Sequence, residues 1–323
     1  MVRREQRATI LDVAARAGVH AATVSRTINV PEKVAPETRR RVEAAIEELG
    51  FVPNRAARGL ITGRTGNVAV IVPDITNPHF AALVRSVERS ARQNDLQVLL
   101  VDTGEHADEE VRAAESLSRE VDGFIVVSPR RLHRALGSLG SAPAVFVNRP
   151  VAEHASILLR TAPAVADALR HLAGLGHARV AYLGGPSGSW AAGERRSAVR
   201  RSGSRVGIEV LELAVGEPTF EAAADVVPGI ADSGVTAVLA FNDQMALGVV
   251  AGLRTLGTTV PDDVSVVGFD DVPMAAMVAP PLTTISLPTS AVGAVAMAML
   301  GEGPARKELF GELVVRHSTA RVR

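Results

Sequence analysis

The sequence contains no cysteine and few aromatic residues: one tryptophan, one tyrosine and eight phenylalanines in 323 residues. The absence of cysteine excludes disulfide bonds, thiolate zinc sites and a cysteine nucleophile, and it favours a reducing compartment. The motifs G-x-x-x-x-G-K-[ST], H-E-x-x-H and G-x-G-x-x-G are also missing. The eight histidines include no pair at metal-ligand spacing, and we expect His177 to be a hydrogen-bonded structural residue. We therefore predict no catalytic residues, no metal and no cofactor.

Segments suited to export or membrane insertion are absent as well. The first residues, MVRREQRATILDV, are basic and lack an unbroken apolar run, so no secretory signal is predicted. Residues 272–301 contain no charged side chain, but four prolines interrupt them, and the last apolar run, Ala291 to Leu300, is too short to span a bilayer. We interpret this stretch as a buried strand followed by a core helix. We expect a cytoplasmic protein with no membrane partner.

The composition predicts a globular protein with an uneven distribution of charge. A length of 323 residues with 47% hydrophobic residues allows two or three folding units. Residues 1–64 hold twelve Lys and Arg against seven Asp and Glu, a net charge of +5, whereas the remainder carries −5. A basic segment on an acidic body indicates a polyanionic partner for that segment. A solvated arginine-rich helix face would give the same charge, so this alternative remains open.

Three short helices are predicted in the basic segment. Thr9 is placed to cap a helix over residues 10–17, whose apolar residues have helical spacing and which Gly18 ends. A second helix begins directly afterwards, and a third extends from about Pro36 to Leu49. Two short helices joined by a tight turn and braced by a third are typical of a helix-turn-helix unit, whose second helix fits the major groove of DNA. A helical cap for the following domain is the alternative.

The rest of the chain alternates short apolar runs with helical patterns. Such runs are typical of buried parallel strands in an α/β protein. The predicted strands are 68–72, 98–102, 124–127, 145–148, 180–183, 237–241 and 264–269. Because about 250 residues are long for one sheet, we expect two halves. The run 149–153 is interpreted as a crossover between them.

Motifs shared with a known family occur along the whole chain. The headpiece motif is ATILDVAARAGVHAATVSRTINVPEKVAPETRRRVEAAIEELGFVPNRAARGL, and it is followed by NVAVIVPDITNPHF, VDGFIVV, LGHARVAYLGGP, AVLAFNDQMALGVV, VSVVGFDD, PPLTTI and ELVVRHST. In this order they resemble the lactose-repressor/galactose-repressor family of bacterial transcription regulators. The resemblance implies an all-α helix-turn-helix headpiece and an α/β core of the periplasmic-binding-protein type. Such a core has two doubly wound subdomains, three crossovers and a ligand between the subdomains.

The resemblance also implies domain boundaries. We expect the headpiece over 1–50, a hinge over 51–65, a first core subdomain over 66–150 and 287–310, and a second over 151–286 and 311–323. In the hinge, Leu60 matches a leucine that wedges into the minor groove at the centre of a palindrome. Unstacking a base step costs a few kcal/mol, which is recovered only if two protomers insert side by side. A simple linker is the alternative for residues 54–66.

Ten residues are predicted to contact DNA. They are Thr9, Ala21, Ala22, Thr23, Ser25, Arg26 and Asn29 in the headpiece and Asn54, Ala57 and Leu60 in the hinge. Ala21 and Ala22 fall where the family has its main base-reading side chains, but an alanine offers only apolar contact to a thymine methyl. Arg26 is the only long donor on its face of the second helix, whereas Thr23 and Ser25 suit phosphate oxygens. His20 stands where the family usually has a serine N-cap.

Polar and aromatic residues follow several of the predicted strands, where the resemblance puts the effector. The expected effector residues are His79, Phe80, Asn148, Trp190, Arg195, Asn242 and Asp270. An aromatic plate with a guanidinium, a carboxylate and amides suits a polyol, so we expect a sugar or a nucleoside. Structural alternatives are a core role for Phe80, pairing of Arg195 with Glu194 or Asp243, and capping of the next turn by Asp270.

Taken together, the sequence predicts a ligand-responsive regulator, a repressor, that binds a pseudo-palindromic operator in double-stranded DNA. A homodimer is expected, with a tetramer as the alternative. Two other classes remain: a solute-binding protein, which would need an export signal in place of residues 1–64, and a doubly wound enzyme with an appended DNA module, which would need a catalytic constellation. The identity of the effector, the operator sequence and the sign of regulation stay open.

Overall fold

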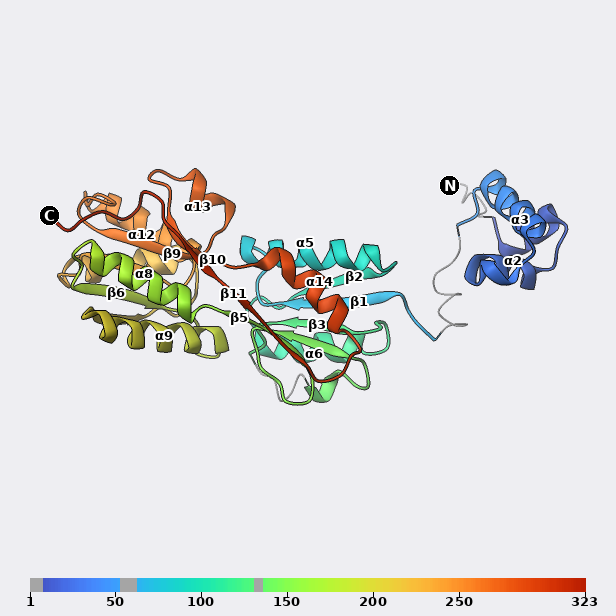
Figure 1. Cartoon of the computed structure of the whole chain (residues 1–323), viewed down its shortest axis with the longest axis horizontal. Coiled ribbons are helices and arrows are strands. Elements are labelled where there is room, and N and C mark those ends of the chain that lie inside the picture. Colours follow the sequence, from blue (N-terminus) through green and yellow to red (C-terminus); the bar gives the residue numbers. More distant parts are fainter. Residues whose placement is uncertain (1–7, 53–62, 131–135) are drawn as a thin grey trace, which may run out of the picture. The chain divides into compact units, whose positions relative to one another are not determined.

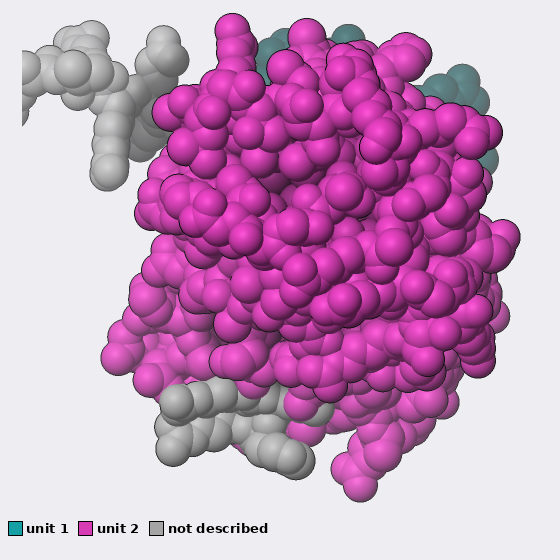
Figure 2. Space-filling view, turned by 90° about the vertical axis from the view of Figure 1, so that its left-hand side faces the viewer, with its two compact units in different colours: residues 1–66 teal, residues 67–323 magenta. Residues whose placement is uncertain are grey.

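The computed structural model describes residues 8–52, 63–130 and 136–323 (Figure 1). By their contacts the residues divide into two compact units, Met1–Gly66 and Asn67–Arg323, coloured teal and magenta in Figure 2. Each unit has a hydrophobic core of its own. The predicted hinge residues Asn54, Ala57 and Leu60 lie outside the described residues.

The first unit is built from three helices and one short 3-10 turn. They are α1 (Ile10–Ala17), α2 (Ala21–Asn29), η1 (Pro31–Lys33) and α3 (Pro36–Leu49). Thr9 caps α1 as predicted: its hydroxyl accepts a hydrogen bond from the amide of Asp12, whose carboxylate accepts one from the amide of Thr9. Gly18 ends α1 in the left-handed conformation that glycine adopts without steric cost. The prediction of three helices is confirmed.

The turn between α1 and α2 is fixed by a side chain of the third helix. Arg41 donates hydrogen bonds from Nη2 to the carbonyl oxygens of Ala17 at 2.5 Å and Gly18 at 3.1 Å. These carbonyls lie at the C-terminal end of α1, where a cation also interacts favourably with the helix dipole. Beneath them, Val13 of α1, Val24 of α2 and Val42 of α3 are completely buried. The angle between the first two helices is therefore set by α3.

The second unit contains two six-stranded sheets, each of which forms the centre of one subdomain. In spatial order the first sheet is β11 (Arg306–Phe310), β5 (Ala155–Arg160), β4 (Ala144–Val147), β3 (Phe124–Val127), β1 (Asn67–Val72) and β2 (Gln97–Asp102). The second is β12 (Glu312–Val314), β10 (Thr283–Ser286), β9 (Ser265–Asp270), β8 (Ala237–Ala240), β6 (Arg179–Gly184) and β7 (Glu209–Ala214). All neighbours pair in parallel except β10 and β12. All seven predicted strands are present, with no end shifted by more than one residue.

Helices cover both faces of each sheet. In the first subdomain they are α5 (Pro78–Gln93), α6 (Ala107–Leu117) and α14 (Thr289–Met299). In the second they are α8 (Ala162–Gly174), α9 (Trp190–Val206), α10 (Phe220–Asp225), α11 (Val227–Ala231), α12 (Asp243–Thr255) and α13 (Pro273–Met277). One apolar cluster continues through both subdomains, and separate clusters lie beneath α6 and beneath α10 to α13. Burial on both faces explains why the central strands are uninterrupted apolar runs.

The chain crosses between the subdomains three times, and the first crossing comes later than predicted. β5 pairs in parallel with β4, with Phe146 opposite Ser156, so residues 151–160 belong to the first subdomain and not to the second. Residues 149–153 are the connection between β4 and β5, and the chain crosses after Arg160. The proline and polar residues of this connection led to its interpretation as a crossover, because turns within a subdomain have the same composition as linkers between subdomains. The other crossings lie between β10 and α14 and at Gly311, between β11 and β12.

The uncharged stretch 272–301 folds into short elements of the second unit. It supplies α13, β10 and α14, of which β10 is largely buried, so the expected strand followed by a helix is confirmed. Among the described residues, no helix combines the length and the apolar character needed to cross a membrane.

We expect Gly293 to be required for the contact between α5 and α14. The amide of Gly293 donates to the hydroxyl of Ser86 at 3.1 Å, and a Cβ atom at Gly293 would lie 2.1 Å from the carbonyl oxygen of Ser86. Gly293→Ala should therefore lower the free energy of unfolding by about 1–3 kcal/mol, as measured by urea denaturation.

Gly193→Ala is the matched control, because a Cβ there would meet nothing within 4 Å in the described residues around α9. That change should raise the free energy of unfolding by about 0.5–1 kcal/mol through helix propensity. If both substitutions changed the free energy of unfolding equally, Gly293 would not be required for the close contact between α5 and α14.

Candidate functional site

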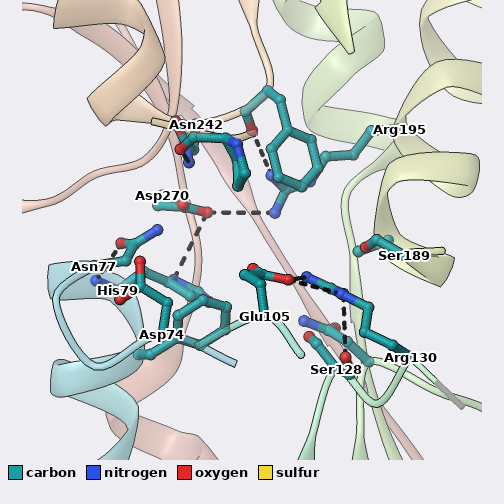
Figure 3. Close-up of a pocket in the computed structure, with 15 residues that line it drawn as sticks. Asp74, Asn77, His79, Glu105, Ser128, Arg130, Ser189, Arg195, Asn242 and Asp270 are labelled. Atoms are coloured by element: carbon teal, nitrogen blue, oxygen red, sulfur yellow. Dashed lines mark hydrogen bonds and ion pairs between the residues drawn. The ribbon is translucent and has the colours of Figure 1, made fainter. Parts of the chain in front are cut away.

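A cleft lies where the carboxyl ends of the strands of both sheets meet (Figure 3). It is lined by Asp74, Asn77, His79, Phe80, Glu105, Ser128, Arg130, Asn148, Ser189, Ala191, Arg195, Pro218, Phe241, Asn242 and Asp270. Each of these residues ends a strand or follows one in the connection or the first turns of the next helix. Part of the cleft is open to solvent. In open α/β sheets this edge is the usual place for a ligand.

A buried ion pair forms the wall of the cleft in the second subdomain. Nη2 of Arg195, in α9, lies 3.3 Å from Oδ1 of Asp270, at the end of β9, and the two side chains are 5% and 4% exposed. Nη1 of Arg195 donates to the carbonyl oxygen of Phe241. The guanidinium also lies between two rings, 4.5 Å from the centroid of Phe241 and 3.7 Å from that of Phe269. These cation–π contacts and hydrogen bonds fix the charge at one position.

His79 faces this pair from the first subdomain. Its Nδ1 lies 3.7 Å from Oδ1 of Asp270, too far for a direct hydrogen bond. Within the described residues this Nδ1 is buried and has no hydrogen-bond partner. Burial lowers the pKa of His79, although the charge of Asp270 partly offsets this effect. Asn77 caps α5 by accepting the His79 amide at 3.0 Å, which fixes the backbone from which the ring projects.

A second ion pair lies on the first-subdomain side of the cleft, between Glu105 and Arg130 (Figure 3). Nε of Arg130 donates to Oε2 of Glu105 at 2.9 Å, and Nη1 donates to the carbonyl oxygen of Ser128 at 3.1 Å. The backbone amide of Arg130 is held by the buried carboxylate of Glu110, at 2.8 Å and 3.1 Å from its two oxygens. Arg130 is therefore held at both its backbone and its guanidinium.

Four of the lining residues have a left-handed backbone. Their φ angles are 63° at Glu105, 48° at Ser128, 57° at Asn148 and 101° at Asp270. Such conformations cost on the order of 1–3 kcal/mol each and persist only where surrounding contacts impose them. At Asn148 one such contact is visible, since its Oδ1 accepts the amide of Leu159 at 3.2 Å. The concentration of these conformations at the cleft marks it as the functional part of the second unit.

Asn242 and Asp243 connect the cleft to the core of the second subdomain. Asn242 caps α12 by accepting the Met245 amide at 2.8 Å, and its Nδ2 donates to the carbonyl oxygen of Pro218 at 2.9 Å. Asp243 is completely buried and accepts hydrogen bonds from the Thr284 hydroxyl at 2.6 Å and the Val272 amide at 2.8 Å. Burial and the nearby charge of Asp270 raise the pKa of Asp243 to about 8.

Six of the seven predicted effector residues line the cleft, and the seventh does not. They are His79, Phe80, Asn148, Arg195, Asn242 and Asp270. Trp190 begins α9 and is half-buried, but it is absent from the lining residues of the described cleft. The alternative partners of Arg195 are not adopted: Glu194 pairs with Arg160 at 3.4 Å, and Asp243 faces Thr284 and Val272.

Sequence analysis missed most of the first-subdomain wall. Asp74, Glu105, Ser128 and Arg130 line the cleft but were not among the expected residues. All four follow β1, β2 or β3, so the rule that found Asn148 and Asp270 would have found them if it had been applied to every strand. His177, by contrast, is structural as predicted: Nδ1 lies 2.8 Å from the Thr236 hydroxyl and Nε2 lies 3.1 Å from the carbonyl oxygen of Ala320.

In the first unit, α2 carries most of the predicted DNA-contacting residues. Ala22 and Arg26 are exposed, whereas Ala21, Thr23, Ser25 and Asn29 are half-buried. Asn29 donates to the Ser25 hydroxyl at 3.3 Å. Thr9 is exposed at the start of α1. In the described headpiece the side chain of His20 makes no capping hydrogen bond to α2, as its departure from serine predicted.

The fold and the comparisons with known proteins together define the class of this protein. The family model for bacterial regulatory proteins of the lacI family matches residues 9–54, and that for a periplasmic binding protein-like domain matches residues 169–319. The class is thus a DNA-binding transcription regulator with a periplasmic-binding-protein-like domain. In the part of the chain that the structure describes, no cluster of three or more His, Asp or Glu could hold a metal ion.

Relatives align over nearly the whole chain. The transcriptional regulator CelR of Thermobifida fusca is 35% identical over 98% of this chain and 99% of its own length. The repressor CytR of Escherichia coli K12 is 31% identical and matched over 98% of both chains. A crystal structure of the Lac repressor dimer bound to operator and the anti-inducer ONPF has a TM-score of 0.86 and 27% identity, over 98% of this chain and all of that chain. The chain belongs to the LacI family, whose members are transcription regulators and not enzymes.

We expect the carboxyl of Asp243 to make stability depend on pH. Because its pKa is raised from 3.8 to about 8, the folded state binds more protons than the unfolded state between these values. Its contribution is therefore present at low pH and is lost as the pH rises toward 8. Between pH 6.5 and 8 the free energy of unfolding should fall with rising pH less steeply for Asp243→Asn than for the unaltered protein. The two slopes should differ by about 1 kcal/mol per pH unit.

Urea denaturation at several pH values measures both slopes. Burial lowers the pKa of His79, His171 and His177, but these histidines are present in both proteins and contribute alike to both slopes, so the difference between the slopes reports on Asp243. Parallel slopes for the two proteins would show that Asp243 is already ionised at pH 6.5.

Proposed function

We propose that this protein is a repressor that binds a pseudo-palindromic operator as a homodimer and changes its operator affinity when a small polyol, a sugar or a nucleoside, occupies the cleft. The observation that carries the proposal is the buried Arg195–Asp270 pair at the carboxyl ends of the strands, in a chain with a lacI-family headpiece. As a bacterial transcription regulator, the protein would act in the cytoplasm. A tetramer is an alternative to the dimer.

Two solved structures of relatives support the proposal. One is the Lac repressor dimer bound to operator and the anti-inducer ONPF. The other is a complex of the transcriptional regulator CelR with cellobiose, which has a TM-score of 0.71 and 32% identity over 97% of this chain and all of that chain. In this chain the Arg195 guanidinium, the Asp270 carboxylate and the Asn148 amide supply the donors and acceptors that a polyol requires.

The proposed effector-binding residues are the predicted ones that line the cleft, together with Trp190 beside it. The ligand would favour one relative orientation of the two subdomains, and that orientation would set the spacing of two hinge segments in a dimer. The spacing decides whether both Leu60 side chains can wedge into the minor groove. A coupling free energy of about 1–3 kcal/mol would change operator affinity about 5–150-fold.

Selection of bound sequences from a randomised duplex pool tests this proposal. The purified full chain should enrich a palindromic sequence, and pooled sugars or pooled nucleosides should weaken or strengthen the enrichment. An enriched palindrome whose binding no pool changes would contradict the effector part of the proposal. A chain that enriches no sequence but binds a sugar would instead support a solute-binding protein.

We expect Arg26→Ala to separate base reading from phosphate contact. Arg26 is exposed on α2, so it is available to a base edge. The substitution should reduce affinity for the selected operator by about 1–3 kcal/mol and leave affinity for random DNA nearly unchanged, as measured by fluorescence anisotropy.

Arg39→Ala removes the same charge from α3, where Arg39 pairs with Glu43 at 2.6 Å, and serves as the control. An equal loss on operator and random DNA in the Arg26 variant would assign that side chain to the phosphate backbone.

A further inference from the structure

The cleft has three acidic and two basic side chains among the lining residues that the structure describes. The acids are Asp74, Glu105 and Asp270, and the bases are Arg130 and Arg195. His79 adds no full positive charge at neutral pH, because burial lowers its pKa. Negative charge is therefore in excess on these walls. A ligand that carried a negative charge of its own would be repelled.

Both arginines are already paired with carboxylates of the protein. Arg195 is held by Asp270, the carbonyl oxygen of Phe241 and the two phenylalanine rings. Arg130 is held by Glu105 and by the carbonyl oxygen of Ser128, and its side chain is only 10% exposed. Nε of Arg195 has no hydrogen-bond partner among the described residues, so this guanidinium keeps a donor for a ligand. Its positive charge, however, is already compensated by Asp270, and that of Arg130 by Glu105, so neither arginine offers an uncompensated charge to a phosphate or a carboxylate.

The facing atoms of Asp270 and His79 are both within hydrogen-bonding reach of one hydroxyl group placed beside them. The two side chains are 3.7 Å apart between Oδ1 and Nδ1, and Nδ1 is buried without a hydrogen-bond partner among the described residues (Figure 3). A hydroxyl can donate to the carboxylate of Asp270 and accept from the Nδ1–H tautomer of His79. A carboxylate or a fully ionised phosphate can only accept, so it cannot satisfy Asp270.

We propose that the cleft selects an uncharged polyol, one hydroxyl of which lies between Asp270 and His79, and that it rejects phosphorylated or carboxylated forms of the same compound. This inference rests on the proposed function, in which the cleft binds a polyol. It narrows the effector to neutral sugars and nucleosides and excludes sugar phosphates, uronic acids and nucleotides.

Calorimetric titration of the full chain with matched pairs of probes tests the inference. The neutral probes are glucose, galactose, ribose and adenosine, and their charged counterparts are glucose 6-phosphate, galacturonate, ribose 5-phosphate and adenosine monophosphate. At least one neutral probe should bind, with its charged counterpart at least about tenfold weaker. A charged probe that binds as tightly as its neutral partner would overturn the inference and leave a polyol effector standing. Absence of binding by every probe would contradict the proposed function itself.

The substitution Glu105→Gln tests whether the pairing of Arg130 is what rejects anions. It keeps the shape of the side chain but removes the carboxylate that holds the guanidinium. The affinity ratio of charged to neutral probe should rise at least about tenfold. Glu109→Gln makes the same change of charge on the surface of α6, where Glu109 pairs with Arg112, and should leave the ratio unchanged. The same ratio in both variants would overturn the role of Arg130.

A second substitution, His79→Phe, tests the hydroxyl site. The ring remains but the hydrogen-bonding nitrogens are lost, so the neutral probe should bind about tenfold more weakly. Urea denaturation verifies that the variant is folded. Unchanged affinity in the folded variant would remove His79 from the site.

Discussion

The buried pair of Arg195 and Asp270 is the interaction on which the geometry of the cleft depends. It ties α9 to the end of β9, and the rings of Phe241 and Phe269 hold the guanidinium from two sides. His79 approaches the same carboxylate from the first subdomain. A buried pair of charges is tolerated only while its geometry and hydrogen bonds persist. The carboxylate of Asp270 is therefore a point where side chains of both subdomains come together. A ligand bound there would act directly on the relative position of the two subdomains.

Around the Arg195–Asp270 pair, the shape of the cleft depends on uncommon backbone conformations. Left-handed φ angles at Glu105, Ser128, Asn148 and Asp270 turn the chain sharply at the ends of four strands. Because the sheets above are packed on both faces, they can hold these conformations against their cost. The rigid apolar core thus makes possible the strained backbone conformations that shape the polar cleft.

The headpiece helices and most strands were predictable, including the edge strand β2, whereas β5, β7, β11, β12 and half of the cleft were not. β1 and β8 are uninterrupted apolar runs, and Thr9 and Gly18 mark a helix by their chemistry alone. β7 is a half-exposed edge strand and β11 a largely exposed one, and both contain charged residues, so their sequences resemble loops. Glu105 and Arg130 were missed although each follows a strand within a few residues. The left-handed backbone at Glu105 and Ser128, near these strand ends, leaves no mark in the pattern of apolar residues.

The last two strands have a consequence for how the chain is made. β11 forms an edge of the first sheet and β12 an edge of the second, and only Gly311 separates them (Figure 1). While a nascent chain is still on the ribosome, β5 and β10 therefore keep an open side until residues 306–314 emerge. An unpaired edge is a template for pairing with other chains. The two subdomains therefore cannot be finished one after the other during translation, because both sheets are completed only when β11 and β12 pair.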